Sequence, residues 1–145
     1  ISSELVSTRV TGVEPAGKAV VAVARNAPLL VHGRTLMLSY GTRLPLGDFA
    51  VVRTPDGVGT ISGVEAPLPY SAASIVAQAK RFLGVHYLWG GLSAWGYDCS
   101  GIIWAVYRAH GMTIPRDADP QFRHGTAVSL HTLQPGDLLF YGTQR

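Results

Sequence analysis

The hydrophobic pattern changes at residues 66–69 (Ala-Pro-Leu-Pro), and this change limits the folds open to the chain. Before this segment, short β-prone runs alternate with turn residues, whereas after it apolar residues recur at helical spacings. Two prolines so close together favour a stiff, extended connection. We therefore predict an α+β chain with a β module at residues 1–66, a linker at 67–70 and a second unit at 71–145.

The first unit contains about five short β-prone segments. The predicted strands are residues 19–24, 29–31, 35–38, 49–53 and 58–61, and the turn signals between them are residues 26–28, 32–33, 46–48 and 55–57. Several short strands separated by such turns are typical of small barrels. We therefore expect a small SH3-like β-barrel.

The second unit begins with two predicted helices. The first runs from a capping Ser71 to Gly84, with the apolar stripe Ile75, Val76, Ala79, Phe82 and Leu83. The second runs from about Cys99 to His110, capped by Asp98 and ended by Gly111. A turn at residues 133–137 leads into a strand at 138–141. The pattern indicates no other strand of that sheet in residues 70–145, so we expect this unit to be truncated after its first core strand.

Cys99 is the single cysteine of the chain and stands at the predicted start of the second helix. One cysteine excludes an intramolecular disulfide and a multi-cysteine metal site. A lone cysteine can be a small buried apolar residue, but a helix N-terminus also favours a thiolate. The preceding glycines allow close backbone approach, and polar Asp98 and Ser100 flank the thiol. These neighbours favour a nucleophile.

Charge and composition exclude several classes of function. The 12 basic and 9 acidic residues leave a net charge of +3, and the basic residues are scattered rather than grouped as in a nucleic-acid-binding patch. No apolar run is long enough for a membrane span. No nucleotide loop, paired carboxylates or metal-ligand cluster occurs, so we expect no cofactor. The start at Ile1 indicates a processed or engineered end. The oligomeric state is left open.

Several motifs together resemble the NlpC/P60 family of cell-wall cysteine peptidases over residues 71–145. They are Tyr-Leu-Trp-Gly-Gly at 87–91, Gly-Tyr-Asp-Cys-Ser-Gly at 96–101, Ile-Pro-Arg at 114–116, Gln121, and Leu-Gln-Pro-Gly-Asp-Leu at 133–138. The resemblance implies a papain-like core. It also implies hydrolysis of the bond between D-γ-glutamyl and a diamino acid in peptidoglycan stem peptides. The expected location is the periplasm or cell wall, with cytoplasmic peptide recycling as the alternative.

The resemblance assigns Cys99 as the nucleophile and places Asp98 and Ser100 in the substrate pocket. Asp98 either holds the free amine of a substrate that begins with L-Ala or caps the helix. Tyr87 and Trp89 are expected to wall the cleft.

Three further residues complete the predicted site. Asp117 follows Arg116, and the two are expected to pair with each other or to contact the substrate. Tyr40, in the β module, is the candidate for a pocket wall contributed by that module.

A cysteine nucleophile needs a base, which is normally histidine. In the NlpC/P60 family this histidine opens the strand that follows the Pro-Gly-Asp turn, but residues 138–145 contain none. We expect the five histidines, at 32, 86, 110, 124 and 131, to be surface or loop residues. The chain is therefore predicted to be inactive alone, either as a fragment of an enzyme or as a naturally non-catalytic form.

Two functions from other classes stay open beside the cysteine peptidase. One is a non-catalytic wall-binding module in which the β module carries the function. The other is an amidase or acyltransferase on the same scaffold, because fold and nucleophile do not fix the substrate.

Overall fold

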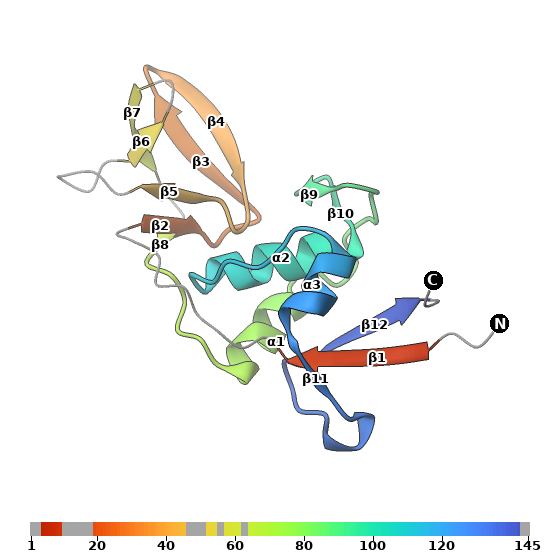
Figure 1. Cartoon of the computed structure of the whole chain (residues 1–145). Helices are drawn as coiled ribbons and strands as arrows, with labels where there is room; N and C mark the ends of the chain where they lie inside the picture. The colour runs from red at the N-terminus through yellow and green to blue at the C-terminus, as the bar shows by residue number, and fades with distance from the viewer. Residues whose placement is uncertain (1–3, 10–18, 46–51, 55–56, 62–63, 143–145) are drawn as a thin grey trace.

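Strands occupy the first part of the chain, and helices together with further short strands follow from residue 72 on (Figure 1). The computed structural model describes residues 4–9, 19–45, 52–54, 57–61 and 64–142. The strands are β1 (Glu4–Arg9), β2 (Ala19–Ala22), β3 (Asn26–Val31), β4 (Arg34–Ser39), β5 (Arg43–Pro45), β6 (Val52–Thr54), β7 (Gly57–Ile61), β8 (Val64–Glu65), β9 (Leu92–Ser93), β10 (Gly96–Tyr97), β11 (Thr126–Val128) and β12 (Leu138–Gly142). The α-helices are α1 (Ala72–Lys80), α2 (Cys99–Ala109) and α3 (Ala118–His124), and a 3-10 turn, η2, spans Leu130–Thr132. This mixture of α and β elements confirms the predicted class.

Strands β2–β8 form two antiparallel sheets, ordered β4-β3-β7-β6 and β5-β2-β8. A two-residue turn joins β3 to β4, and its residues His32 and Gly33 have φ angles of 47° and 75°. Two positive φ angles are what a type I′ hairpin turn requires. The predicted turn at residues 32–33 is therefore confirmed.

The two sheets share a small apolar core. Leu29 and Val31 of β3 are buried, and residues of β2 and β5 pack against them. No closed barrel forms among the strands that the structure describes, so the SH3-like assignment stays a prediction. The expected turn at residues 46–48 and parts of the expected elements at 49–53 and 55–57 lie outside the described residues.

Strand β1 belongs to a third sheet, ordered β11-β1-β12. It pairs antiparallel with β12 from Glu4↔Gly142 to Thr8↔Leu138, and with β11 on its other side. Figure 1 shows β1 and β12 side by side below the helices. The expectation that no other strand of this sheet lies in residues 70–145 was wrong. β11 has only three residues, too few to produce a periodic signal, and its partner β1 is more than 100 positions away in the sequence.

Helix α1 begins as predicted and ends earlier than predicted. The Ser71 hydroxyl caps it by accepting a hydrogen bond from the Ser74 backbone N–H at 3.1 Å. The helix ends at Lys80, and a turn follows up to Gly84, whose φ is +80°. Leu83 was expected on the apolar stripe but is 78% exposed, because helical spacing no longer applies beyond Lys80.

Helix α2 lies at the centre of the main core. It is capped by Asp98 and followed by Gly111 at φ +78°, both as predicted. The core combines residues of β2, β10, α1, α2 and β12 with residues of the turns after β4, α1 and α2: Val21, Tyr40, Ile75, Phe82, Tyr97, Ala105, Val106, Tyr107, Ala109, Met112, Ile114 and Leu138. Helix α2 therefore connects the strands of the first unit to the elements that surround Cys99.

Candidate active site

Cys99 is the first residue of α2 and its side chain is exposed. The loop that leads to it folds back on itself through the short pair β9–β10. A Cβ at Gly91 would lie 2.5 Å from the Gly96 carbonyl oxygen, and a Cβ at Gly101 would lie 2.5 Å from the Gly91 carbonyl oxygen. Real Cβ atoms do not approach so closely. A Cβ at Gly96 would lie 2.6 Å from the Leu88 Cβ, so the predicted close approach is confirmed at Gly91 and Gly96, whereas a Cβ at Gly90 would meet nothing within 4 Å and the prediction was wrong there.

Asp98 is the centre of a hydrogen-bond network beside the thiol. Its carboxylate accepts five hydrogen bonds: from Gly90 N–H at 3.0 Å, the Ser100 hydroxyl at 3.2 Å, Gly101 N–H at 2.6 Å, and the two terminal nitrogens of Arg116 at 3.0 and 2.7 Å. Asp98 therefore both caps α2 and fixes the loop before it. The cap, which was one of two predicted roles for Asp98, is confirmed.

The charges in this network shift the ionisation of both partners. The hydrogen bond from Arg116 is the main cause that lowers the pKa of Asp98, and the Gly101 and Ser100 donors lower it further. Partial burial acts in the opposite direction. The same hydrogen bond raises the pKa of Arg116. The pair is therefore ionised throughout the neutral range.

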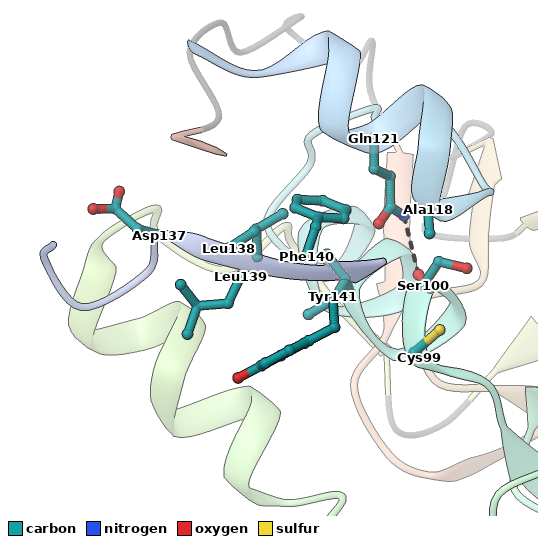
Figure 2. A pocket seen from close by; sticks show the side chains of 10 residues that line it. Cys99, Ser100, Ala118, Gln121, Asp137, Leu138, Leu139, Phe140 and Tyr141 are labelled. Carbon is teal, nitrogen blue, oxygen red and sulfur yellow. Dashed lines mark hydrogen bonds between the residues drawn. The ribbon is translucent and has the colours of Figure 1, made fainter. Parts of the chain in front are cut away.

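A cavity of about 460 Å³ opens beside Cys99, between α2, α3 and β12. Figure 2 shows the sulfur of Cys99 near one end of this lining and Asp137 at the other. Its lining is mostly apolar and consists of Cys99, Ser100, Ile103, Ala118, Gln121, Asp137, Leu138, Leu139, Phe140 and Tyr141. The exposed thiol thus borders a space that a ligand can enter.

Gln121 holds the first turn of α2 against α3. It is 2% exposed, and its amide donates to the backbone oxygens of Ser100 at 3.0 Å, Pro115 at 2.9 Å and Arg116 at 3.4 Å. Figure 2 shows the bond to Ser100 as a dashed line between two residues that line the cavity. The sequence marked Gln121 only as part of a motif, because its distant partners are backbone atoms that no residue pattern reveals.

The predicted pocket residues do not all gather at the cavity. Ser100 lines it and is 7% exposed. Tyr87 is 56% exposed. Desolvation is the main cause that raises the pKa of its phenol, and the neighbouring Cys99 and Asp98 raise it further. Trp89 is 87% exposed. Tyr87 is therefore beside the thiol, while Trp89 projects from the same loop into solvent.

Asp117 and Tyr40 have opposite surroundings. Asp117 is the N-cap residue of α3, yet its side chain makes no capping bond, is 79% exposed and lies 3.9 Å from Arg116. Tyr40 is 2% exposed, donates to Gln78 of α1 at 2.9 Å and does not line the cavity. Its ring packs edge-on against Phe82 at 5.0 Å. Burial raises the pKa of Tyr40 to about 12.

None of the five histidines lines the cavity. Four are exposed, as expected, but His110 is 4% exposed, which corrects the expectation of a surface or loop position. Its Nδ1 donates to the Val106 carbonyl at 2.8 Å, and its Nε2 lies 2.8 Å from the Ser74 hydroxyl. His110 lies between the end of α2 and α1. Its position at a helix end suggested a peripheral residue, but the packing of the two helices buries it.

Across the described residues, no three His, Cys, Asp or Glu side chains come together as they would around a metal ion. None of the helices in that part of the chain is both long and apolar enough to cross a membrane.

Known proteins that resemble the chain belong to one group, which the family match and two relatives describe. Residues 84–145 match the NlpC/P60 family. The chain is 41% identical over 122 residues to a gamma-D-glutamyl-L-lysine dipeptidyl-peptidase of Bacillus cereus, which covers 74% of the chain and 36% of that protein. It is 45% identical over 71 residues to the Bacillus subtilis protein of the same name, covering 49% of the chain and 24% of the relative.

A solved structure agrees with these relatives. The crystal structure of an NlpC/P60 family protein from Bacillus cereus matches with a TM-score of 0.68 and 34% identity. The match covers 81% of the chain and 44% of that structure. The chain thus spans only about a quarter to a half of the length of each of these proteins.

Proposed function

We propose that the chain carries the nucleophile of a cysteine peptidase that cleaves the D-γ-glutamyl–diamino acid bond of cell-wall stem peptides. The observation that carries this proposal is the exposed Cys99 thiol, which stands at the N-terminus of α2 and borders the cavity. The family match at residues 84–145 includes this cysteine. The name of the Bacillus relatives supports γ-D-glutamyl bonds as the substrate class.

The proposed reaction has two steps. The Cys99 thiolate attacks the γ-carbonyl carbon of the D-glutamyl residue, the C–N bond breaks, and the diamino acid leaves as an amine after taking up a proton. Water then hydrolyses the resulting thioester and regenerates the thiol. The partial positive charge at the N-terminus of α2 favours the attacking thiolate.

The base is the part of this reaction that the described site lacks. His110 is enclosed between α1 and α2, and the other histidines do not line the cavity. We therefore propose that a base from outside these 145 residues completes the site, and that the chain alone does not turn over a peptide substrate. The cavity beside Cys99 gives such a group a place to enter.

Substrate binding is proposed for the exposed side of the site. Tyr87, which lies beside Cys99, and the exposed Trp89 of the same loop are the proposed substrate contacts outside the cavity, and Ser100 is the proposed contact inside it. Because Asp98 already accepts five hydrogen bonds, a substrate ammonium could bind there only by displacing them. The exposed carboxylate of Asp117 is the more available one. A wall contributed by Tyr40 would need its buried ring to become accessible.

Hydrolysis of L-Ala-γ-D-Glu-L-Lys tests the proposed activity. The assay uses a polypeptide that contains these residues together with the segment that supplies the base, and compares it with its Cys99→Ala variant. We expect release of L-Lys by the first protein and none by the second. Equal release by both proteins would remove Cys99 from the mechanism. Binding of wall material without hydrolysis by either protein would favour the wall-binding alternative.

A further inference from the structure

The ion pair between Arg116 and Asp98 lies directly beside the nucleophile. Both terminal nitrogens of the guanidinium bind the two carboxylate oxygens, at 3.0 and 2.7 Å. Arg116 also donates to the Ser100 hydroxyl at 3.0 Å and to the Gly91 carbonyl at 3.4 Å. The sequence suggested Asp117 as its partner, but that carboxylate lies 3.9 Å away and is largely exposed. Arg116 is thus committed to the residue that precedes Cys99.

Such an arrangement has an electrostatic consequence. An ionised carboxylate next to a thiol disfavours the thiolate, since two negative charges would lie close together. A bidentate guanidinium cancels most of that charge, and a planar fork does so in a fixed geometry. The side chains are only 25% and 11% exposed for Arg116 and Asp98, so water screens the pair less than it would on an open surface.

We propose that Arg116 is a positioning residue that neutralises Asp98 and thereby keeps the surroundings of Cys99 favourable to the thiolate. Asp98 can then cap α2 and fix the loop at Gly90 without opposing the ionisation that the proposed peptidase reaction needs. The inference rests on the proposed nucleophile. The charge of Cys99 contributes, after Asp98 and Asp117, to raising the pKa of Arg116, which places the guanidinium within electrostatic reach of the sulfur.

The other charged and titratable residues near the thiol or along its cavity stay the same in the test below. They come from the preceding loop, the segment before α3 and β12 with the turn before it: Tyr87, Asp117, Asp137 and Tyr141. Asp98 and Arg116 are joined by a bidentate contact. Removing one or both members of this pair therefore isolates its contribution.

The reactivity of Cys99 can be measured as its rate of alkylation by iodoacetamide, monitored by intact-mass analysis at several pH values. We expect Arg116→Gln to slow alkylation about three- to tenfold at neutral pH and to move the pH profile upward. Asp98→Asn keeps a capping oxygen and removes the negative charge, so it should react as fast as the unchanged chain or faster. The double variant should return close to the original rate.

Two controls separate charge from folding. Arg123→Gln removes a charge from the exposed pair that Arg123 makes with Asp119 on α3, and should leave the alkylation profile unchanged. Arg116→Lys keeps the charge without the fork, and should keep the profile even if its melting temperature falls. A profile for Arg116→Gln identical to the original, or equal slowing by Arg116→Gln and Asp98→Asn, would overturn the proposal. If Arg116→Gln does not fold, a shifted profile in Arg116→Lys or an unrestored double variant would do the same.

Alkylation reports on the thiol whether or not a peptide is hydrolysed. If the alkylation profiles are as expected but the completed protein hydrolyses no peptide, only the proposed function is refuted. Conversely, if the completed protein is an active peptidase but substitution of Arg116 leaves the alkylation rate of Cys99 unchanged, only this inference is refuted.

Discussion

The two ends of helix α2 use polar groups in opposite ways. At the N-terminal end, an exposed Cys99 borders a cavity, and a network centred on Asp98 holds the surrounding loop. At the C-terminal end, His110 is buried and ties α2 to Ser74 of α1. The difference shows that residue type alone does not locate the site. The N-terminal end leaves the thiol exposed, whereas the C-terminal end packs against α1.

Breaking the C-terminal end should have the largest effect on stability. His110→Ala removes two hydrogen-bond contacts and leaves a cavity, so we expect a loss of about 3 kcal/mol in the free energy of unfolding. His124→Ala, at an exposed position of α3, is the matched control and should change stability by less than about 0.5 kcal/mol. Chemical denaturation measures both. Equal losses of stability in His110→Ala and His124→Ala would show that the C-terminal end of α2 does not depend on His110 for its packing.

The middle of α2 tests how closely the first unit packs on this helix. Gly41 has φ +79°, and a Cβ there would lie 2.6 Å from the Ala105 carbonyl oxygen. Gly41→Ala should therefore cost about 2–3 kcal/mol from backbone strain and overpacking together. Gly33→Ala has a similar φ of +75° but open space, and should cost only about 1 kcal/mol, from strain alone. Melting curves that do not separate the two would show that the contact with α2 is loose.

At the N-terminal end of α2, the contribution of Asp98 to the free energy of unfolding should depend on pH. The pKa of Asp98 is lowered in the folded chain, so its charge adds stability above its ordinary pKa of 3.8 and loses that contribution as the pH falls toward the folded value. The stability difference between the unchanged chain and Asp98→Asn should accordingly shrink on acidification below about pH 4. Denaturation at several pH values measures it. A difference that grows on acidification would contradict the ion pair with Arg116.

The smallest effect is expected at the thiol itself. Because the side chain of Cys99 is exposed, Cys99→Ala should change stability by less than about 0.5 kcal/mol while removing the alkylation site. Thermal unfolding of the two proteins checks this. A large loss of stability in Cys99→Ala would instead indicate that Cys99 is a packed apolar residue.

Local features of the site were predictable from sequence, whereas long-range ones were not. A cap and a helix terminator act over a few residues, so Asp98, Cys99 and Gly111 could be placed at the ends of α2 in advance. The partner of Arg116 and the burial of His110 depend on segments brought together by the fold. The pairing of β1 with β12 likewise joins opposite ends of the sequence, which no local pattern encodes.

Tyr40 illustrates the same limit for the predicted binding residues. Its place in the first unit was visible in sequence, but its burial against Phe82 and Gln78 follows from how the turn after β4 packs on α1 and the segment that follows it. The apolar stripe of α1 was likewise predictable up to Lys80. Beyond it, Leu83 became exposed, because the sequence pattern alone does not specify where helical geometry stops.

The central claim, that Cys99 is a nucleophile for γ-D-glutamyl groups, is tested most directly by trapping an acyl-enzyme on the chain itself. A 4-nitrophenyl ester of L-Ala-γ-D-Glu supplies a leaving group that needs no protonation, so a missing base does not prevent attack. Intact-mass analysis should find one L-Ala-γ-D-Glu acyl group on Cys99, formed at least about tenfold faster than from the matching α-L-glutamyl ester. Equal rates for the two esters, or the same adduct on Cys99→Ala, would contradict the account.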